Sequence, residues 1–345
     1  MKEHFYQHHQ PFELEMGGAL PHLTIKYFTA GTYDPSKNNV IWVCHTLTAT
    51  ANVFEWWAKL FGESDYYNPK EHFIICATVL GSCYGTTGPM DAPEGFKYHD
   101  FPKITMTDMV RLHEVLRQHL DIQHIHTIIG ASSGGNQALE WAIMQPDLFD
   151  HLITVSANAT RSPWAIAFSA SQRMAIEADP TWKENQPKAG LEGLKAARAI
   201  AMISYRNYDT YALKQREPNP NIYENYRADS YQRHQGDKLV ARFDAFTYYT
   251  MALAMDTYNL GRGRGGVINA LQRIKAKTLI IGLSTDILFP VHEQAFLHQH
   301  IKDSHFEIIE SPYGHDGFLI EMDEIVRIVK TFNRNTQNPT SQVCH

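Results

Sequence analysis

The sequence lacks the features that would direct this protein to nucleic acid, a membrane or the cell exterior. No block of basic residues occurs, and 31 Lys and Arg against 37 Asp and Glu give a net charge of −6, which does not favour a polyanionic partner. No apolar run is long enough to span a bilayer. Residues 1–12 are polar and lack the apolar stretch of a signal peptide, so no secretory signal is expected.

Cysteine is also scarce. Four cysteines in 345 residues do not suggest a disulfide framework in a chain of this length. Cys44 and Cys76 lie in apolar runs and are expected to be small buried hydrophobic residues. Cys83 lies in a Gly-rich loop, and Cys344 lies in a polar tail. The composition therefore favours a reduced, cytoplasmic protein.

Two motifs that suggest ligand binding are incomplete. Residues 261–266 are Gly-rich, but they follow no strand and lack the Lys-Ser/Thr pair of a phosphate-binding loop, so they predict a turn. His292, His298 and His300 lie in one helical stretch without a carboxylate or cysteine to complete a metal site. The sequence therefore predicts neither a metal site nor a bound cofactor.

What the sequence does contain is an alternation of short strands and helices around ample apolar material, 43% of all residues. Residues 107–120 and 137–144 carry apolar side chains at helical spacing. Such alternation predicts a mostly parallel central sheet with helices on both faces. Its six predicted strands are residues 40–45, 73–80, 126–130, 151–156, 278–283 and 306–310.

One long interval interrupts this alternation. Residues 159–275 show no strand pattern, although a crossover between parallel strands needs only one helix. Residues 164–178, 191–203 and 239–255 predict helices instead, with a polar, Tyr-rich stretch between the last two. We therefore predict a core formed by residues 1–160 and 273–335, a helical lid of residues 161–272, and a mobile tail of residues 336–345.

Ser132, Asp286 and His315 follow predicted strands in the order that defines the triad of the α/β-hydrolase fold. Ser132 lies in Gly130-Ala131-Ser132-Ser133-Gly134, a Gly-x-Ser-x-Gly turn between a strand and a helix. Taken singly, each of the three could be an ordinary turn or loop residue. Their joint order predicts that Ser132 is the nucleophile, His315 the general base and acid, and Asp286 the group that orients His315.

An acyl-transfer serine also needs backbone N–H groups aimed at the developing oxyanion. The amide of Ser133, directly after the nucleophile, is one expected donor, and Leu47 in the loop after an early strand is the other. His45 precedes that loop without partners at metal-ligand spacing, so we expect it to have a structural role.

Several long motifs resemble the homoserine O-acetyltransferase family of α/β-hydrolase-fold enzymes along nearly the whole chain. They are His45-Thr46-Leu47-Thr48, residues 80–89 (LGSCYGTTGP), Phe101-Pro102 with Ile104-Thr105, the elbow with Gln137-Ala138-Leu139-Glu140-Trp141, Trp164-Ala165-Ile166-Ala167-Phe168, Gln235-Gly236-Asp237-Lys238, residues 261–265 and residues 311–316.

The resemblance implies ping-pong transfer of an acetyl group from acetyl-CoA through Ser132 to the hydroxyl of L-homoserine, in methionine biosynthesis. It also implies that Arg206 and Asp316 hold the amino acid, although Arg206 could instead be a surface arginine of the lid. A homodimer formed through the lid helices is implied as well.

Departures from the family pattern keep other reactions open. Ala131, Ser133 and Asn136 differ from the usual elbow, Gly-Gly-Ser-Met-Gly-Gly-Met, and Ala49 replaces a common glycine. Serine as acceptor and succinyl-CoA as donor remain alternatives, because one methylene gives only about 1–3 kcal/mol of discrimination. A serine esterase or thioesterase with the same triad is a further alternative, and the large predicted lid argues against it.

Overall fold

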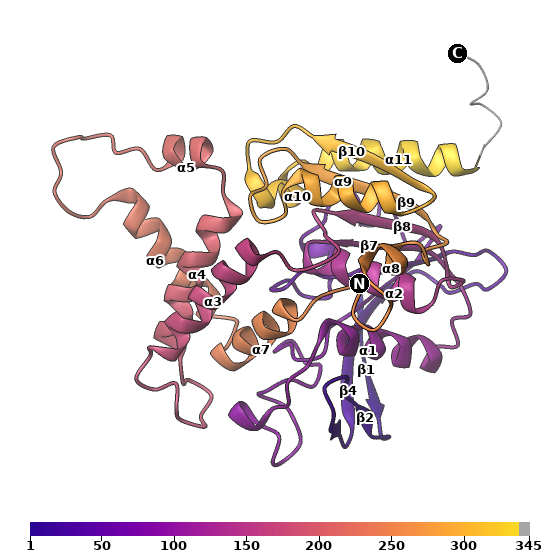
Figure 1. Ribbon diagram of the computed structural model, residues 1–345, viewed down its shortest axis with the longest axis horizontal. Helices are drawn as coiled ribbons and strands as arrows, with labels where there is room; N and C mark the ends of the chain where they lie inside the picture. The colour runs from indigo at the N-terminus through magenta and orange to yellow at the C-terminus, as the bar shows by residue number, and fades with distance from the viewer. Residues whose placement is uncertain (338–345) are drawn as a thin grey trace.

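The computed structural model describes residues 1–337 and shows an eight-stranded sheet flanked by helices (Figure 1). The strand order is β1-β4-β6-β5-β7-β8-β9-β10, and all pairings from β6 to β10 are parallel. These parallel strands are β5 (Val40–Cys44), β6 (Phe73–Ala77), β7 (Ile125–Ala131), β8 (Phe149–Val155), β9 (Lys277–Leu283) and β10 (Ser304–Ile309). The predicted parallel sheet is therefore confirmed.

Helices cover both faces of this sheet, so alternate residues of one strand enter two different cores. Trp42 packs with α1 and α2 on one face, whereas Ile41 and Val43 pack with α11 on the other. The helices of the core are α1 (Met106–His119), α2 (Ser133–Met144), α8 (Val267–Leu271), α9 (Val291–His300), α10 (Gly317–Ile320) and α11 (Met322–Gln337), with single turns η1 (Val53–Glu55), η2 (Tyr98–Asp100) and η3 (Gly314–Asp316).

Two antiparallel strands at the N-terminus extend the sheet beyond the predicted strands. β1 (Lys2–His8) pairs with β4 (Leu23–Ala30), and β4 pairs with β6. A small hairpin of β2 (Phe12–Glu13) and β3 (Ala19–Leu20) lies between them in sequence. β1 is an edge strand with a largely exposed, polar sequence, so it lacks the apolar run that reveals a buried strand.

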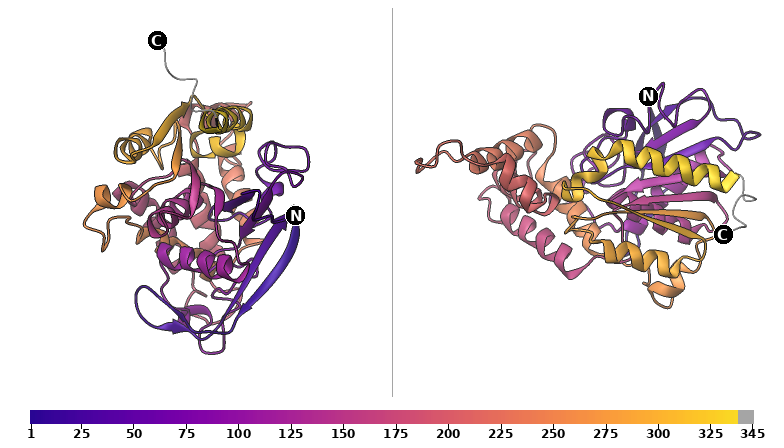
Figure 2. Two further views of the ribbon diagram at one scale, coloured as in Figure 1. Left: turned by 90° about the vertical axis from the view of Figure 1, so that its right-hand side faces the viewer. Right: turned by 90° about the horizontal axis from the view of Figure 1, so that it is seen from above.

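Between β8 and β9 the chain forms a group of helices beside the sheet, as Figures 1 and 2 show. They are α3 (Pro163–Glu177), α4 (Leu191–Tyr205), α5 (Tyr208–Lys214), α6 (Arg227–Val240) and α7 (Ala245–Asp256). The single helix predicted for residues 239–255 is wrong, because α6 ends before a connector at residues 241–244. Asp244 caps the new helix by accepting a hydrogen bond from the Thr247 amide.

Residues 261–266 form turns that lead back to the core, and Arg264 makes a bidentate ion pair with the buried Glu140 of α2. Residues 336 and 337 of the predicted tail are the end of α11, and the remainder of that tail, including Cys344, lies outside the described residues. Within residues 1–337, no helix combines the length and apolar character needed to cross a bilayer.

Candidate active site

Ser132 occupies a strained turn between β7 and α2. Its φ of 53° and ψ of −127° lie in a region that residues other than glycine seldom adopt. The turn is possible because its flanking glycines approach backbone closely: a Cβ on Gly130 would lie 2.3 Å from Gly134, and one on Gly134 would lie 2.1 Å from the Cys44 carbonyl oxygen. The sharp turn places Ser132 at the carboxyl end of the parallel strands.

The three residues predicted as a triad form one hydrogen-bonded chain. The Ser132 hydroxyl lies 2.9 Å from His315 Nε2, and His315 Nδ1 lies 2.7 Å from Asp286 Oδ2. All three are buried. An N–H at Nδ1, directed to the carboxylate, leaves Nε2 free to accept the serine proton. The geometry therefore suits a serine nucleophile activated by histidine.

Asp286 is itself held in place by backbone donors. The amides of Leu288 and Phe289 each donate to its Oδ1 at 2.9 Å, which leaves Oδ2 for His315. The Phe289 ring stacks on the imidazole with a centroid separation of 5.1 Å and an interplanar angle of 18°. Both the carboxylate and the imidazole plane are thus fixed before any substrate binds.

The structure brings the two predicted oxyanion donors to the same end of the sheet. The close approach of Gly134 to Cys44 places the loop after β5 against the start of α2, and Gln137 Nε2 donates to the His45 carbonyl at 3.2 Å. Within residues 1–337, the amides of Leu47 and Ser133 donate to no protein acceptor. Both N–H groups are therefore available to a ligand.

His45 supports the loop from inside the core. Its Nδ1 donates to the Thr46 carbonyl at 2.8 Å, and its Nε2 accepts from the Val79 amide at 3.1 Å. Burial lowers the pKa of His45 to about 4, so the ring is neutral at pH 7, as an Nε2 that accepts a hydrogen bond requires. In the described part of the chain, no group of three His, Cys, Asp or Glu residues is arranged to hold a metal ion.

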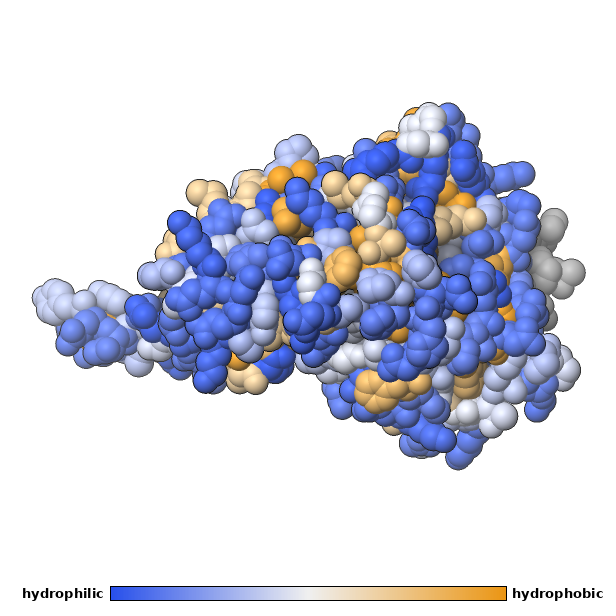
Figure 3. Space-filling model, turned by 90° about the horizontal axis from the view of Figure 1, so that it is seen from below, coloured by the Kyte–Doolittle hydropathy of each residue, from blue (hydrophilic) through white to orange (hydrophobic). Residues whose placement is uncertain are grey.

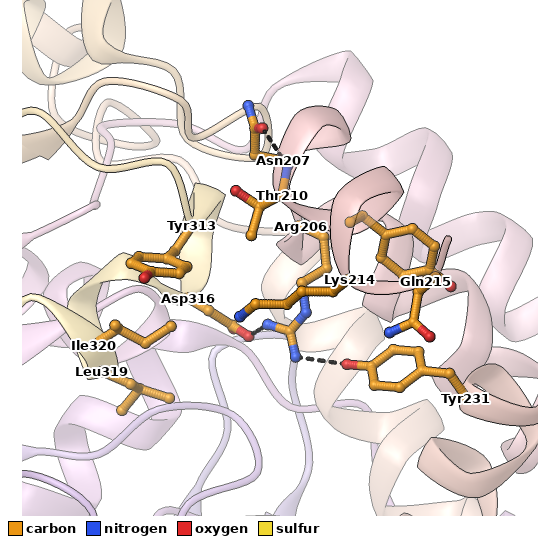
Figure 4. A pocket seen from close by; sticks show the side chains of 11 residues that line it. Arg206, Asn207, Thr210, Lys214, Gln215, Tyr231, Tyr313, Asp316, Leu319 and Ile320 are labelled. Atoms are coloured by element: carbon orange, nitrogen blue, oxygen red, sulfur yellow. Dashed lines mark hydrogen bonds and ion pairs between the residues drawn. The ribbon is translucent and has the colours of Figure 1, made fainter. Parts of the chain in front are cut away.

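Arg206 and Asp316 form an ion pair at the edge of a pocket of about 260 Å³ (Figure 4). Arg206 follows α4, and Asp316 directly follows His315. The second guanidinium nitrogen, Nη2, lies 2.9 Å from the hydroxyl of Tyr231 on α6. Tyr231 was not among the predicted residues, because nothing distinguishes it within a stretch that contains many tyrosines. Tyr211 also lines the pocket, whereas Tyr208 is largely exposed.

The lid residue Arg206 is close to the triad because the end of α4 packs on the turn that carries His315. A Cβ on Gly314, whose φ is 63°, would lie 2.9 Å from the Arg206 carbonyl carbon, so only glycine permits this approach. The Tyr205 ring lies 5.7 Å from the His315 ring. The pocket and His315, the predicted base, are thus adjacent, because Arg206 directly follows Tyr205 and Asp316 directly follows His315.

The polar side chain of Asn136 is used for internal packing. Asn136 is 1% exposed, and its Oδ1 accepts a hydrogen bond from the Asn158 amide at 3.1 Å. Asn158 in turn donates to Glu293 at 2.9 Å. This departure from the family elbow thus joins α2 to the loop after β8.

Comparison with known proteins agrees with this architecture. A profile of the alpha/beta hydrolase fold matches residues 39–321. The curated homoserine O-acetyltransferase of Cyclobacterium marinum is 43% identical over 335 residues, which cover 96% of this chain and 95% of the relative. The chain belongs to the homoserine O-acetyltransferase family. It is therefore an enzyme of that family, and the resemblance inferred from its motifs is confirmed.

Two solved structures share the fold at lower sequence identity. Homoserine O-acetyltransferase from Bacillus anthracis superposes with a TM-score of 0.86 at 22% identity, covering 96% of this chain and 98% of that one. Esterase E22 also has a TM-score of 0.86, at 20% identity, and covers 96% of this chain and 99% of its own. Because a transferase and an esterase fit equally well, the fold alone does not distinguish the two activities.

Proposed function

We propose that this enzyme transfers an acetyl group from acetyl-CoA to the hydroxyl of L-homoserine through an acyl-Ser132 intermediate. The observation that carries the proposal is the placement of the Arg206–Asp316 pair beside the Ser132–His315–Asp286 chain. The full-length similarity to homoserine O-acetyltransferases supports the choice of substrates. The route uses only side chains, backbone amides and the acyl-CoA itself.

In the first half-reaction, Ser132 Oγ attacks the thioester carbonyl while His315 Nε2 takes the hydroxyl proton. The amides of Leu47 and Ser133 stabilise the negative charge on the carbonyl oxygen of the tetrahedral intermediate. When this intermediate collapses, the carbon–sulfur bond breaks and His315 gives its proton to the departing thiolate. Acetyl-Ser132 and free CoA thiol result.

The second half-reaction repeats these steps with an amino acid as nucleophile. His315 removes the proton from the γ-hydroxyl of homoserine, whose oxygen attacks acetyl-Ser132, and the proton then returns to Ser132 Oγ. Arg206 offers two parallel N–H donors to the α-carboxylate, and Asp316 accepts from the α-ammonium group. In the free enzyme these two side chains pair with each other, so the amino acid would enter between opposite charges that are already assembled.

The helices of residues 161–272 favour transfer over hydrolysis. Helices α3 and α4 pack together, α4 reaches the turn that carries His315, and Arg206 comes from this same region. Such a cover limits the access of water to an acyl-enzyme. A serine esterase would need no paired site for an amino acid beside its base, which is why we place the esterase second.

The proposal is tested by following release of free thiol from acetyl-CoA with L-homoserine, with L-serine and with no acceptor. We expect sustained release, beyond the one thiol per enzyme that acylation of Ser132 produces, only with homoserine, because its γ-hydroxyl is one methylene further from the Arg206–Asp316 pair than the hydroxyl of serine. Equal release in all three mixtures would identify a hydrolase. Thiol release from succinyl-CoA but not from acetyl-CoA would show that the assignment of acetyl-CoA as the acyl donor is wrong.

We further propose a homodimer formed through the lid. The face shown in Figure 3 is mainly hydrophilic, with small apolar patches over both the lid and the core. Helices α3, α4 and α5 of the lid expose several large apolar side chains, among them Trp164, Met174, Ile203 and Leu213. Light scattering should give twice the chain mass of 39.4 kDa. A monomeric mass at micromolar concentration would reject the dimer.

A further inference from the structure

The peptide group between Thr46 and Leu47 is held by its carbonyl oxygen. That oxygen accepts from His45 Nδ1 at 2.8 Å and from the Ala49 amide at 3.1 Å. In a planar trans peptide the C=O and the following N–H point in opposite directions. Donors that fix the Thr46 oxygen therefore also fix the direction of the Leu47 N–H, which is the proposed oxyanion donor.

A second peptide group continues this connection. The Ala49 N–H that reaches Thr46 belongs to the same peptide unit as the Thr48 carbonyl. The Thr48 oxygen accepts from Arg242 Nη1 at 2.6 Å and from the Tyr84 hydroxyl at 3.4 Å. Hydrogen bonds thus run from the Arg242 guanidinium through two peptide units to the Leu47 amide.

Arg242 belongs to the lid, in the connector between α6 and α7. Its guanidinium also donates to the Tyr84 hydroxyl, and the Tyr84 ring packs at 5.7 Å against the neighbouring Phe243. Within residues 1–337, Arg242 makes no ion pair with a carboxylate. Its positive charge is therefore directed at the Thr48 and Tyr84 oxygens, on loops of the core.

We propose that Arg242 is a positioning residue that aims and polarises the Leu47 oxyanion donor from the lid. A cation at one end of a chain of peptide hydrogen bonds strengthens the N–H donor at the other end, because each bond polarises the next. The lid thereby contributes to acylation as well as covering the site. This inference rests on the proposed acyl-Ser132 chemistry and assigns to Arg242 a part in it.

The test compares Arg242→Met, Arg242→Lys and Arg233→Met. Arg233 is an exposed arginine of α6 that pairs only with Asp229 within the described residues, so its variant controls for loss of a lid charge. The first-turnover burst with p-nitrophenyl acetate and the rate of Ser132 labelling by a fluorophosphonate both measure attack that depends on the oxyanion site. Neither measurement requires acetyl-CoA or homoserine.

For Arg242→Met we expect both rates to fall about 10-fold. This is a smaller loss than the roughly 10²–10³-fold fall in rate when an oxyanion donor itself is removed, because the Leu47 N–H stays in place. The KM for homoserine should stay unchanged, and Arg242→Lys should restore most of the rate, because its ammonium can still donate to Thr48. Arg233→Met should match the wild type. Thermal unfolding should find the fold intact in each variant, because both arginines are exposed.

Two failures are distinguishable. If the fluorophosphonate does not label wild-type Ser132, the proposed acyl-serine chemistry is wrong. If the wild type is labelled and Arg242→Met is labelled equally fast, or if only the KM for homoserine changes, the positioning role of Arg242 is overturned while the proposed function stands.

Discussion

Replacing Ser132 with alanine is expected to lower acyl transfer about 10⁶-fold, the scale seen when a triad serine is removed from a hydrolase. The loss should be this large because, among residues 1–337, Ser132 Oγ is the only hydroxyl hydrogen-bonded to His315 Nε2. The fold should survive, since serine and alanine both carry a Cβ and share the strain at a φ of 53°. The measurement is homoserine-dependent thiol release, with circular dichroism as a check on folding.

Ser156 provides a matched control for this substitution. It is buried, it also has a positive φ, of 48°, and its hydroxyl has no partner within residues 1–337. The Ser156→Ala variant should therefore keep the wild-type activity, although it carries the same substitution as Ser132→Ala at a position with a similar backbone φ. Mass spectrometry should find an acetyl group on wild-type Ser132 after mixing with acetyl-CoA alone. Thiol release by Ser132→Ala at the wild-type rate would exclude the acyl-serine route.

For Arg206→Met, we expect kcat/KM for homoserine to fall about 10²-fold. A hydrogen-bonded ionic contact contributes up to about 3 kcal/mol, and each 1.4 kcal/mol is a factor of ten. Arg206→Lys should retain less than half of this contact energy, because an ammonium cannot make the bidentate pair. Steady-state kinetics with homoserine varied at saturating acetyl-CoA measures the effect.

Measuring the acylation step alone distinguishes a loss of acceptor binding in Arg206→Met from general damage to the active site. The first-turnover burst with p-nitrophenyl acetate should be unchanged in Arg206→Met, because Arg206 contacts Asp316 and Tyr231 rather than the triad. A burst that slows as much as kcat/KM falls would mean that the substitution disturbs His315 through the neighbouring Asp316. The assignment of Arg206 to the acceptor site would then be wrong.

The parallel part of the sheet could be predicted because buried strands need continuous apolar runs, and the elbow could be predicted because its geometry needs glycine at fixed spacing. The edge strand β1 could not, since it buries little and its sequence is polar. The break between α6 and α7 was missed although Asp244 is a common capping residue. Apolar spacing continues across the break and conceals it.

Side-chain partners from distant segments were the least predictable part of the site. The pairing of Arg206 with Asp316 depends on the packing of the end of α4 on Gly314, more than 100 positions later in the chain. Tyr231 and Arg242 have no local signal. The Tyr231 hydroxyl accepts a single hydrogen bond from Arg206, and Arg242 donates to the Thr48 carbonyl and the Tyr84 hydroxyl, all from distant segments. Such contacts are set by tertiary packing, which local sequence patterns do not contain.

Strands β8 and β9 are neighbours in the sheet, although residues 156–276 separate them along the chain. Bringing together the two ends of a connection costs an entropy that grows only with the logarithm of its length, so that doubling it adds about 0.6 kcal/mol. Changes in the length of exposed loops within this connection should therefore add little to the entropic cost of pairing β8 with β9. Because Arg206 comes from this segment whereas the proposed triad residues Ser132, Asp286 and His315 do not, evolution could exchange the acceptor while leaving those three residues in place.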